Sequence, residues 1–264
     1  MERRIFDSLG GECELYGIDI DAAALMRGQA WIAHMHERLT RFDPGSELSR
    51  FNASAGNWIA VSEDIEALLR ESLRAFDVSG GLVNVAVLPA LLAAGYTRDF
   101  ASGPTTRSAP PRIPPLPEVL ELRDGEARLA TGTTVDLGGI AKGWLADRLA
   151  TDLGENVLVN LCGDLYARGG GATGEGWPVG FGDKTLLLKD LGAATSGTTK
   201  RAWAGGHHLI DPRTGLPAES DLSEVSVLAS TATDAEIYAK VALLLGANAA
   251  PKWLEGRSQG WSLR

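Results

Sequence analysis

The sequence is organised around one stretch, Thr195-Ser196-Gly197-Thr198-Thr199-Lys200-Arg201-Ala202-Trp203-Ala204-Gly205-Gly206-His207-His208-Leu209-Ile210-Asp211-Pro212-Arg213-Thr214-Gly215-Leu216-Pro217. It places hydroxyls, two adjacent imidazoles and a carboxylate between glycines and prolines, which hold the backbone in turns. Polar groups on such loops often carry chemistry, and a histidine beside Asp211 could act as a general base. The alternative is a loop in which a histidine–aspartate contact only holds a turn.

The composition is that of an ordinary soluble globular chain. The 264 residues are 44% apolar and 22% charged, with a formal net charge of −9. This length predicts one large domain or two lobes, and the negative charge disfavours nucleic acid and anionic membranes as partners. The two cysteines, Cys13 and Cys162, form neither a metal-binding spacing nor a disulfide framework. With no signal-like apolar run and no stretch of about 20 apolar residues, a cytoplasmic location is expected.

Caps, turns and apolar periodicity predict a mixture of helices and strands. Asp21 and Ser62 are suited to cap helices, and Asp124-Gly125 is typical of a tight hairpin turn. The proline-rich residues 103–117 indicate an extended surface connection. Helices and strands mix without regular alternation, which favours an α+β fold. Helices are expected from Asp21 to about Thr40, from Ser62 to the ending Gly80-Gly81, over a stretch that carries Trp144, Leu145 and Leu149, and at 234–245. Strands are expected at 11–20, 119–122, 127–130, 157–161, 165–168, 225–228 and 261–263, and several short strands are expected within 177–191.

A second informative stretch reads Asp136-Leu137-Gly138-Gly139-Ile140-Ala141-Lys142-Gly143. We expect a strand to lead into the glycines and a helix to follow, so that backbone N–H groups at the helix start can cradle a phosphate. Lys142 would add positive charge, and Asp136 could orient a hydroxyl or a donor. The spacing matches neither a Walker loop nor GxGxxG. The alternative is a close strand–helix packing turn with a solvated lysine.

The helix expected at 234–245 carries Glu236 and Lys240, which lie four residues apart and therefore on one face. Taken alone, this pair is an ordinary helix-stabilising ion pair, and Thr233 with Glu236 could form a capping box.

In combination, these stretches resemble the family of FAD:protein FMN transferases, also known as the ApbE family of flavin transferases. The resemblance extends over nearly the whole chain in the family's order. Its most specific parts are Asp136–Gly143, Thr195–Gly197 and residues 208–215. The other matching blocks are residues 9–11, 42–52, 81–89 and 159–164.

The resemblance implies a two-lobed, T-fold-like architecture with mixed sheets, in which residues 1–264 form a single domain and FAD lies between the lobes. It implies Mg²⁺ as the usual cofactor. Family members cleave FAD between its phosphates, pass FMN to a threonine or serine hydroxyl of a target flavoprotein and release AMP; some hydrolyse FAD instead. His208 is the candidate base for the acceptor hydroxyl, and Lys142 with the glycine turn would hold the pyrophosphate.

Residue by residue, the resemblance places flavin or adenine contacts on Leu9, Phe42, Leu82, Val83, Asn84, Asp136, Lys142, His208 and Leu209. It places a metal-binding carbonyl on Gly139. The family's Met-Gly-Thr is here Leu9-Gly10-Gly11, and its Asp-Pro-Thr is Asn84-Val85-Ala86.

This chain departs from the family most informatively at the positions of the metal-binding side chains. Counted back from Gly246, the family's Asp and Thr fall on Glu236 and Lys240; counted forward, they fall on Asp234 and Tyr238. The first register is preferred because it keeps the apolar face and Gly246 aligned. A protonated lysine cannot bind a metal. Two interpretations remain open: the Lys240 ammonium, held by Glu236, partly replaces Mg²⁺, or the two residues only stabilise the helix and the metal site is lost. A flavin-binding homologue with little or no transfer activity and a FAD pyrophosphatase are the alternatives to a transferase.

Overall fold

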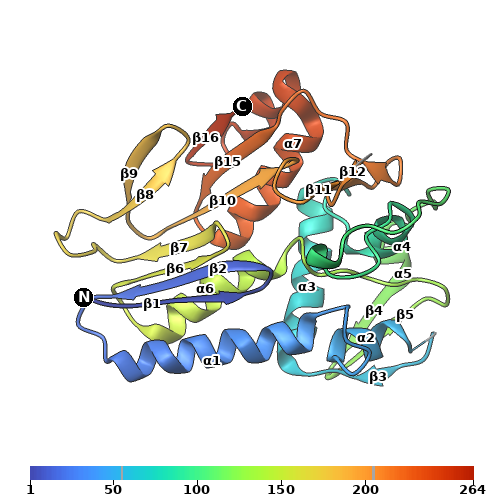
Figure 1. Ribbon diagram of the computed structural model, residues 1–264, viewed down its shortest axis with the longest axis horizontal. Coiled ribbons are helices and arrows are strands. Elements are labelled where there is room, and N and C mark those ends of the chain that lie inside the picture. The colour runs from blue at the N-terminus through green and yellow to red at the C-terminus, as the bar shows by residue number, and fades with distance from the viewer. Residues whose placement is uncertain (55, 204–205) are drawn as a thin grey trace. The chain divides into compact units, whose positions relative to one another are not determined.

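The computed structural model describes residues 1–54, 56–203 and 206–264. Ala204 and Gly205 of the opening stretch lie outside the described residues. The predicted α+β class is confirmed, and the chain forms two compact units (Figure 1). Unit 1 comprises Met1–His36, Ile140–Gly197 and Leu222–Arg264, and unit 2 comprises Glu37–Gly139 and Thr198–Asp221. Among the described residues, no helix has the length and apolar character that crossing a membrane requires.

Unit 1 is built on a seven-stranded sheet in which all neighbouring strands run antiparallel. The hairpin of the first two strands was only half predicted, because the first strand is an edge strand that buries no residue fully and therefore lacks an apolar signal. In spatial order the strands are β1 (Glu2–Ser8), β2 (Gly11–Gly17), β6 (Val157–Leu161), β7 (Asp164–Arg168), β10 (Leu191–Gly197), β15 (Glu224–Ala229) and β16 (Gly260–Leu263).

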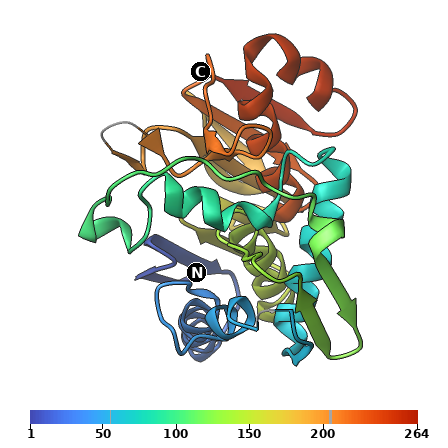
Figure 2. The ribbon, with the colours of Figure 1, turned by 90° about the vertical axis from the view of Figure 1, so that its right-hand side faces the viewer.

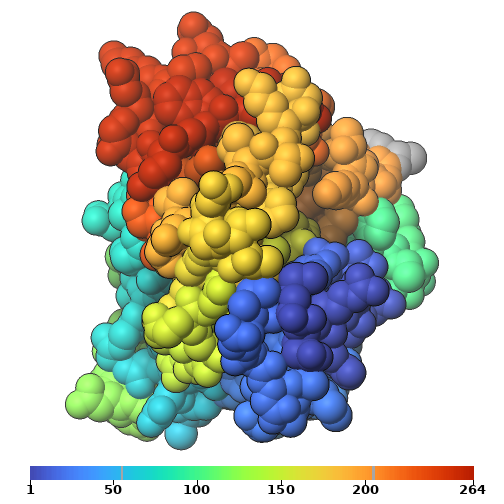
Figure 3. Space-filling model, turned by 90° about the vertical axis from the view of Figure 1, so that its left-hand side faces the viewer, coloured from blue at the N-terminus to red at the C-terminus, as the bar shows by residue number. Residues whose placement is uncertain are grey.

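Both faces of this sheet are covered. On one face lie α6 (Ala141–Leu153) and α7 (Ala232–Leu254), and α1 (Ala22–Leu39) packs on α6 through Gly28. The other face is covered by the hairpin of β8 (Trp177–Phe181) and β9 (Lys184–Leu188), part of the yellow chain in Figure 3. Because successive strand residues point to opposite faces, Ala193 faces the hairpin while Ala194 packs with Ala235 of α7.

The start of α7 is capped from two sides. Thr231 is the N-cap and accepts a hydrogen bond from the Asp234 N–H at 3.0 Å, so the predicted capping box of Thr233 with Glu236 is wrong. Asp147 of α6 accepts from the N–H groups of Ala232 (2.7 Å) and Thr233 (2.9 Å). Burial raises the pKa of Asp147 despite these hydrogen bonds. The sequence prediction missed the cap because the capping hydroxyl belongs to Thr231, two residues before Thr233, and because Asp147 of another helix binds the remaining N–H groups.

The other end of the predicted helix lies at Gly246, as expected. Gly246 adopts the non-helical angles φ 76° and ψ 173°, which favour glycine, and α7 resumes beyond it as far as Leu254. The prediction was therefore right about the break and missed the second helical segment.

Gly192 of β10 lies against the start of α7, and we expect Gly192→Ala to destabilise the protein. A Cβ at this position would lie 2.2 Å from the carbonyl carbon of Thr231 and from the nitrogen of Ala232, both of them backbone atoms. Overpacking of this kind costs about 1–3 kcal/mol in the free energy of unfolding. Urea denaturation should show it. The matched control is Gly180→Ala in β8, where an added Cβ meets no atom within 4 Å. Equal unfolding midpoints for the two variants would contradict the prediction.

Unit 2 contains most of the shorter elements. Ser62 caps α3 as predicted, and the predicted hairpin turns at Asp124-Gly125. The extended proline-rich segment, residues 103–115, is the long green chain in Figure 2. The helical elements are α2 (Glu47–Asn52), α3 (Glu63–Val78), the 3₁₀ turn η1 (Val85–Val87), α4 (Leu88–Ala93), the 3₁₀ turn η2 (Phe100–Ser102) and α5 (Leu116–Val119). The strands are β3 (Ile59–Ala60), β4 (Leu120–Arg123), β5 (Glu126–Leu129), β11 (Ala202–Trp203), β12 (Gly206–His207), β13 (Ile210–Asp211) and β14 (Leu216–Pro217).

The last four of these strands belong to the opening stretch, and they are anchored on α4. Ile210 packs in a buried cluster with Leu88, Ala90, Leu91 and Ala94. Residues 88–94, which are mostly apolar, thus support the histidine-containing loop.

Candidate functional site

The segment that precedes the glycines at 138–139 is not a strand, and this sequence prediction is wrong. Instead the side chain of Asn52 brackets Val135: its Oδ1 accepts from the Val135 N–H at 2.8 Å, and its Nδ2 donates to the Val135 carbonyl at 2.9 Å. The Asp136 N–H donates to the Val85 carbonyl at 2.8 Å. A side chain 83 residues away in sequence therefore replaces a strand partner.

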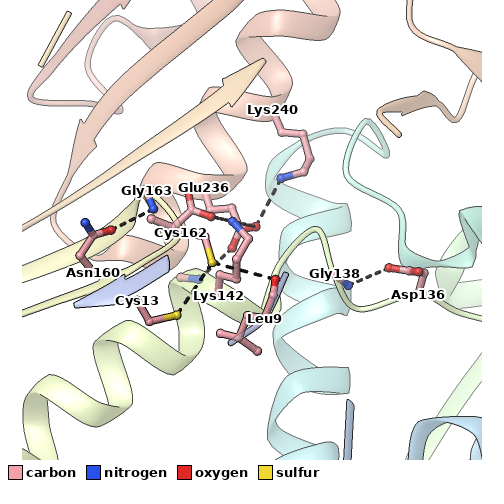
Figure 4. Close-up of polar contacts among 12 residues, drawn as sticks. Leu9, Cys13, Asp136, Gly138, Lys142, Asn160, Cys162, Gly163, Glu236 and Lys240 are labelled. Carbon is pink, nitrogen blue, oxygen red and sulfur yellow. Dashed lines mark hydrogen bonds and ion pairs between the residues drawn. The ribbon is translucent and has the colours of Figure 1, made fainter. Parts of the chain in front are cut away.

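Asp136 is held by charge as well as by its backbone. Its carboxylate forms an ion pair with Arg41, with 2.6 Å between Oδ2 and Nε, and its Oδ1 accepts from the Gly138 N–H at 2.8 Å (Figure 4). The Asp136 side chain is thus fixed at the turn, where its orientation is set before any ligand arrives.

In unit 1, Lys142 lies in the first turn of α6 and belongs to a cluster of four charged side chains. Its ammonium forms an ion pair with Asp164 and lies 3.9 Å from Glu236 Oε1. The Lys240 ammonium approaches the same Glu236 oxygen at 3.5 Å (Figure 4). We call Lys142, Asp164, Glu236 and Lys240 the lysine–carboxylate cluster. Sequence reasoning found three of its members and missed Asp164, although Asp164 ends one of the matching blocks.

The carboxylates of this cluster are much more deeply buried than its lysines. The side chains of Asp164 and Glu236 are 3% and 2% exposed, whereas those of Lys142 and Lys240 are 17% and 16% exposed. The lysines are therefore the more accessible members of the cluster. Buried carboxylates are tolerated only when they are paired, and here each one has an ammonium partner.

Gly143 explains part of the glycine pattern through packing. Its N–H donates to Glu236 Oε2 at 2.9 Å, and a Cβ would lie 2.6 Å from the Ala232 carbonyl oxygen. Helix α6 can approach α7 this closely only without a side chain there. The N–H expected to cradle a phosphate is thus used by a carboxylate, and for Gly143 the packing interpretation holds.

The arrangement supports the preferred register for the departures on α7. Glu236 and Lys240 face Lys142, whereas the ring of Tyr238 packs edge-on against Trp253, with 5.4 Å between the centroids. The alternative pair, Asp234 and Tyr238, does not join the cluster.

The residues present do not fit the Mg²⁺ site that the resemblance implies. Mg²⁺ requires oxygen ligands, and a lysine ammonium has no lone pair to offer. The Glu236 carboxylate already accepts from Gly143 and lies close to two ammonium groups. Within residues 1–54, 56–203 and 206–264, no group of three or more His, Cys, Asp or Glu side chains is placed to hold a metal ion.

Asp164 is positioned by the tight turn between β6 and β7. Cys162 adopts the left-handed angle φ 60°, and Asn160 Oδ1 accepts from the Gly163 N–H at 2.9 Å (Figure 4). The Cys162 and Cys13 sulfur atoms lie 3.9 Å apart as free thiols. Their hydrogen bond, with burial, raises the pKa of Cys13 far above its usual range. The turn thus holds Asp164 against Lys142.

Two other positions that the sequence analysis singled out in unit 1, Leu9 and Thr195, take part in a turn and in the pairing of two strands. Leu9 adopts φ 54° in the β1–β2 turn, and its N–H donates to the ring of His36 at 3.2 Å. Thr195 is hydrogen-bonded through its hydroxyl to that of Ser226 at 2.8 Å across β10 and β15.

The two adjacent histidines have different surroundings in unit 2. Both ring nitrogens of His207 contact backbone: Nδ1 accepts from the Leu209 N–H at 3.2 Å, so Nε2 carries the proton and donates to the Ala218 carbonyl at 3.0 Å. His208 donates its backbone N–H to the Arg201 carbonyl at 3.2 Å. His207 therefore holds the loop through both of its ring nitrogens.

Asp211 sets a turn, but it does so through Arg213 and Gly215 and not through the histidine–aspartate contact that the sequence analysis considered. Its carboxylate accepts from the backbone N–H of Arg213 at 2.9 Å and pairs with the guanidinium of the same residue. Its carbonyl accepts from the Gly215 N–H at 2.8 Å, and Gly215 adopts φ 69°. Asp211 has no part in orienting a histidine through these contacts.

An aromatic stack that the sequence indicated only at Phe42 lies beside Asp136 in unit 2. The Arg41 guanidinium lies 4.3 Å from the Phe42 ring centroid and 4.6 Å from that of Tyr96. The Tyr96 ring contacts that of Trp203, with 5.7 Å between centroids. The Phe42 side chain remains exposed. Flat, partly exposed rings of this kind suit a planar ligand.

Residues 82–84 are committed to local structure. The Asn84 side chain accepts from the Ala86 N–H and donates to the Pro114 carbonyl, both at 2.9 Å, and thereby ties the proline-rich segment to η1. The Val83 N–H donates to Ser79 Oγ at 2.9 Å, and Leu82 is half-buried. The change from Asp to Asn thus gives a side chain that both donates and accepts.

The sequence model of the ApbE family matches residues 12–262. The chain belongs to the ApbE family. It is 32% identical over 243 residues to the FAD:protein FMN transferase of Treponema pallidum, a match that covers 76% of this chain and 65% of that protein, which is less than two thirds of its length. The FAD:protein FMN transferase of Haemophilus influenzae is 27% identical over 255 residues, covering 83% of this chain and 71% of that protein.

Solved structures of the ApbE family share the fold. The apo form of the Pseudomonas stutzeri flavinyl transferase ApbE superposes with a TM-score of 0.83 at 20% identity, over 96% of this chain and 87% of that chain. The ApbE protein of Thermotoga maritima gives 0.82 at 22% identity, over 96% and 88%. These likenesses establish the fold of this ApbE-family chain.

Proposed function

We propose that this ApbE-family chain is a FAD:protein FMN transferase that moves FMN from FAD to a threonine or serine hydroxyl of a target flavoprotein and releases AMP. The observation that carries the proposal is the family match over residues 12–262, which includes the lysine–carboxylate cluster and the histidine-containing loop. On this proposal, residues 1–264 act as a single domain to which both units contribute.

The reaction is a phosphoryl-group transfer, and the chain's residues have distinct tasks in it. The acceptor hydroxyl oxygen attacks the FMN phosphorus, the bond from that phosphorus to the bridging oxygen breaks, and AMP leaves with the bridging oxygen. His208 takes the proton of the hydroxyl, because a protonated hydroxyl is a weak nucleophile. Lys142 stabilises the negative charge on the phosphate oxygens.

The same proposal assigns the flavin and adenine contacts to residues of both units. Phe42, Leu82, Val83 and Leu209 supply apolar surface, and Leu9 contributes at the β1–β2 turn. Asp136 offers a carboxylate whose orientation is fixed by Arg41. Asn84, whose side-chain amide ties η1 to the proline-rich segment, contributes one further contact to the flavin or adenine.

One assay tests the function. The purified protein is incubated with FAD and a candidate target domain, and covalent flavin fluorescence is read on the target after denaturation, with AMP quantified in parallel. The control is the same target with its acceptor Thr→Val. Labelled target with equimolar AMP supports the transferase. AMP without labelled target would show a FAD pyrophosphatase, and FAD binding without AMP a flavin-binding homologue; either result would overturn the proposal.

A further inference from the structure

We propose that Lys142 and Lys240 together form a dicationic site for the diphosphate of the substrate, which binds without a divalent metal ion. This inference deepens the proposed function and rests on it for the identity of the ligand, a dinucleotide containing a diphosphate. It concerns only the lysine–carboxylate cluster, whose four residues all lie in unit 1.

The charges of the cluster alternate along a chain of contacts. Asp164 pairs with Lys142, Lys142 lies 3.9 Å from Glu236, and Glu236 lies 3.5 Å from Lys240. Two carboxylates and two ammonium groups sum to zero formal charge, so the cluster carries no unbalanced charge before a ligand binds. The carboxylates are nearly inaccessible while the lysines keep some exposure, so an approaching anion meets the ammonium groups first.

The burial of Glu236 distinguishes this arrangement from an ordinary helix-surface ion pair. An i,i+4 pair that only stabilises a helix is solvent-exposed on both sides. Here Glu236 is 2% exposed, accepts from the Gly143 N–H and holds a second lysine from another helix. Glu236 is therefore the carboxylate that both ammonium groups approach, while Asp164 holds Lys142 more closely.

The same contacts work against a divalent cation. A metal ion at Glu236 would lie beside two like-charged ammonium groups, and Lys240 would contribute repulsion where an oxygen ligand is needed. Two lysine ammonium groups carry the same charge as one divalent ion and donate hydrogen bonds to phosphate oxygens. Because the two lysines are part of the protein, the positive charge that a metal ion would otherwise bring is already present at the site.

The test compares ligand affinity with and without metal. Binding of FAD is measured by flavin fluorescence and calorimetry in EDTA and in millimolar Mg²⁺, with riboflavin, which lacks phosphate, as the second ligand. For the unaltered protein we expect FAD affinities in the two conditions to agree within about twofold. A tenfold or larger dependence on Mg²⁺ would overturn the proposal, and this measurement needs no variant.

Two variants sharpen the test. Lys240→Met should weaken FAD binding about tenfold to hundredfold, the range of a lost charge-assisted hydrogen bond, and leave riboflavin binding unchanged. Glu236→Asp/Lys240→Thr restores oxygen ligands at both positions, and its FAD affinity should become dependent on Mg²⁺. The control is Lys252→Thr, an exposed lysine on the same helix. Circular dichroism checks that each variant folds.

The outcomes separate this inference from the proposed function. Unchanged FAD affinity in a folded Lys240→Met variant would exclude Lys240 from the site. If FAD binds without metal and depends on Lys240, but no target is labelled and no AMP is released, the anion site stands and the transferase proposal fails.

Discussion

Replacing Lys142 with methionine is expected to lower the free energy of unfolding by about 3–5 kcal/mol, the range for breaking a buried ion pair by removing one partner. Asp164 would lose its ammonium partner at 3% exposure, and Glu236 would keep only Lys240 and the Gly143 N–H. Because Lys142 is itself partly exposed, the lower end of the range is expected. Urea denaturation monitored by tryptophan fluorescence measures the effect.

Two control variants show whether the loss of stability in Lys142→Met comes from the lost positive charge. Lys142→Arg keeps the positive charge and should retain most of the stability. Lys252→Met makes the same change at an exposed position of α7, where surface substitutions usually alter stability by less than about 0.5 kcal/mol. If Lys142→Met unfolds at the same urea concentration as Lys252→Met, the ion pair with Asp164 does not stabilise the fold.

Replacing His208 with alanine is expected to slow FMN transfer about 10²–10⁴-fold, the usual contribution of a general base. FAD should remain bound, because the lysine–carboxylate cluster and the aromatic stack are untouched. The measurement is the initial rate of covalent flavin attachment beside the Kd for FAD. A general base must be deprotonated, so we expect the rate of the unaltered protein to rise with pH and this rise to disappear in the variant.

His207→Ala provides the comparison for His208→Ala. It removes the ring that joins the Leu209 N–H to the Ala218 carbonyl, so it should lower stability and disturb the loop while the pH dependence of the residual rate persists. Unchanged turnover in His208→Ala would remove His208 from the mechanism. A pH dependence lost in His207→Ala instead would exchange the roles of the two histidines.

The parts of the fold that the sequence predicts well are those set by neighbouring residues. Ser62 and Gly80-Gly81 mark both ends of α3, Asp124-Gly125 turns a hairpin, and Gly246 interrupts α7. In each case a cap or a left-handed backbone angle is a property of a few consecutive residues. The residues next to these helix ends and turns were therefore sufficient to predict them.

The features that escaped prediction depend on partners far away in sequence. Asn52 brackets Val135 in place of a strand, and Asp147 caps the helix that begins at Ala232. Neither contact has a periodic or motif signal, since the partners lie more than 80 residues apart. Strand β1 was missed for a different reason, because an edge strand buries too little to show an apolar pattern.

The candidate site also combines residues that the sequence indicates with contacts that only the folded chain creates. Lys142, Glu236 and Lys240 were each singled out by spacing or resemblance, but only the folded chain brings Lys142 to Glu236 and adds Asp164. The preference for His208 over His207 came from its place before Leu209, and the backbone contacts of His207 give that preference a physical reason. Arg41, Tyr96 and Trp203 were overlooked because their stacking joins three separate segments.

The geometry of Glu236 has a consequence for how such a chain can diverge. One of its oxygens accepts from Gly143 while the other faces both lysines, a double reach for which an aspartate is one methylene too short. Threonine at position 240 beside an unchanged glutamate loses a cation without completing a ligand set, and aspartate beside an unchanged lysine weakens the contact with the ammonium groups. We therefore expect positions 236 and 240 to be energetically coupled: Glu with Lys, or Asp with Thr, should bind the diphosphate more tightly than either mixed pair.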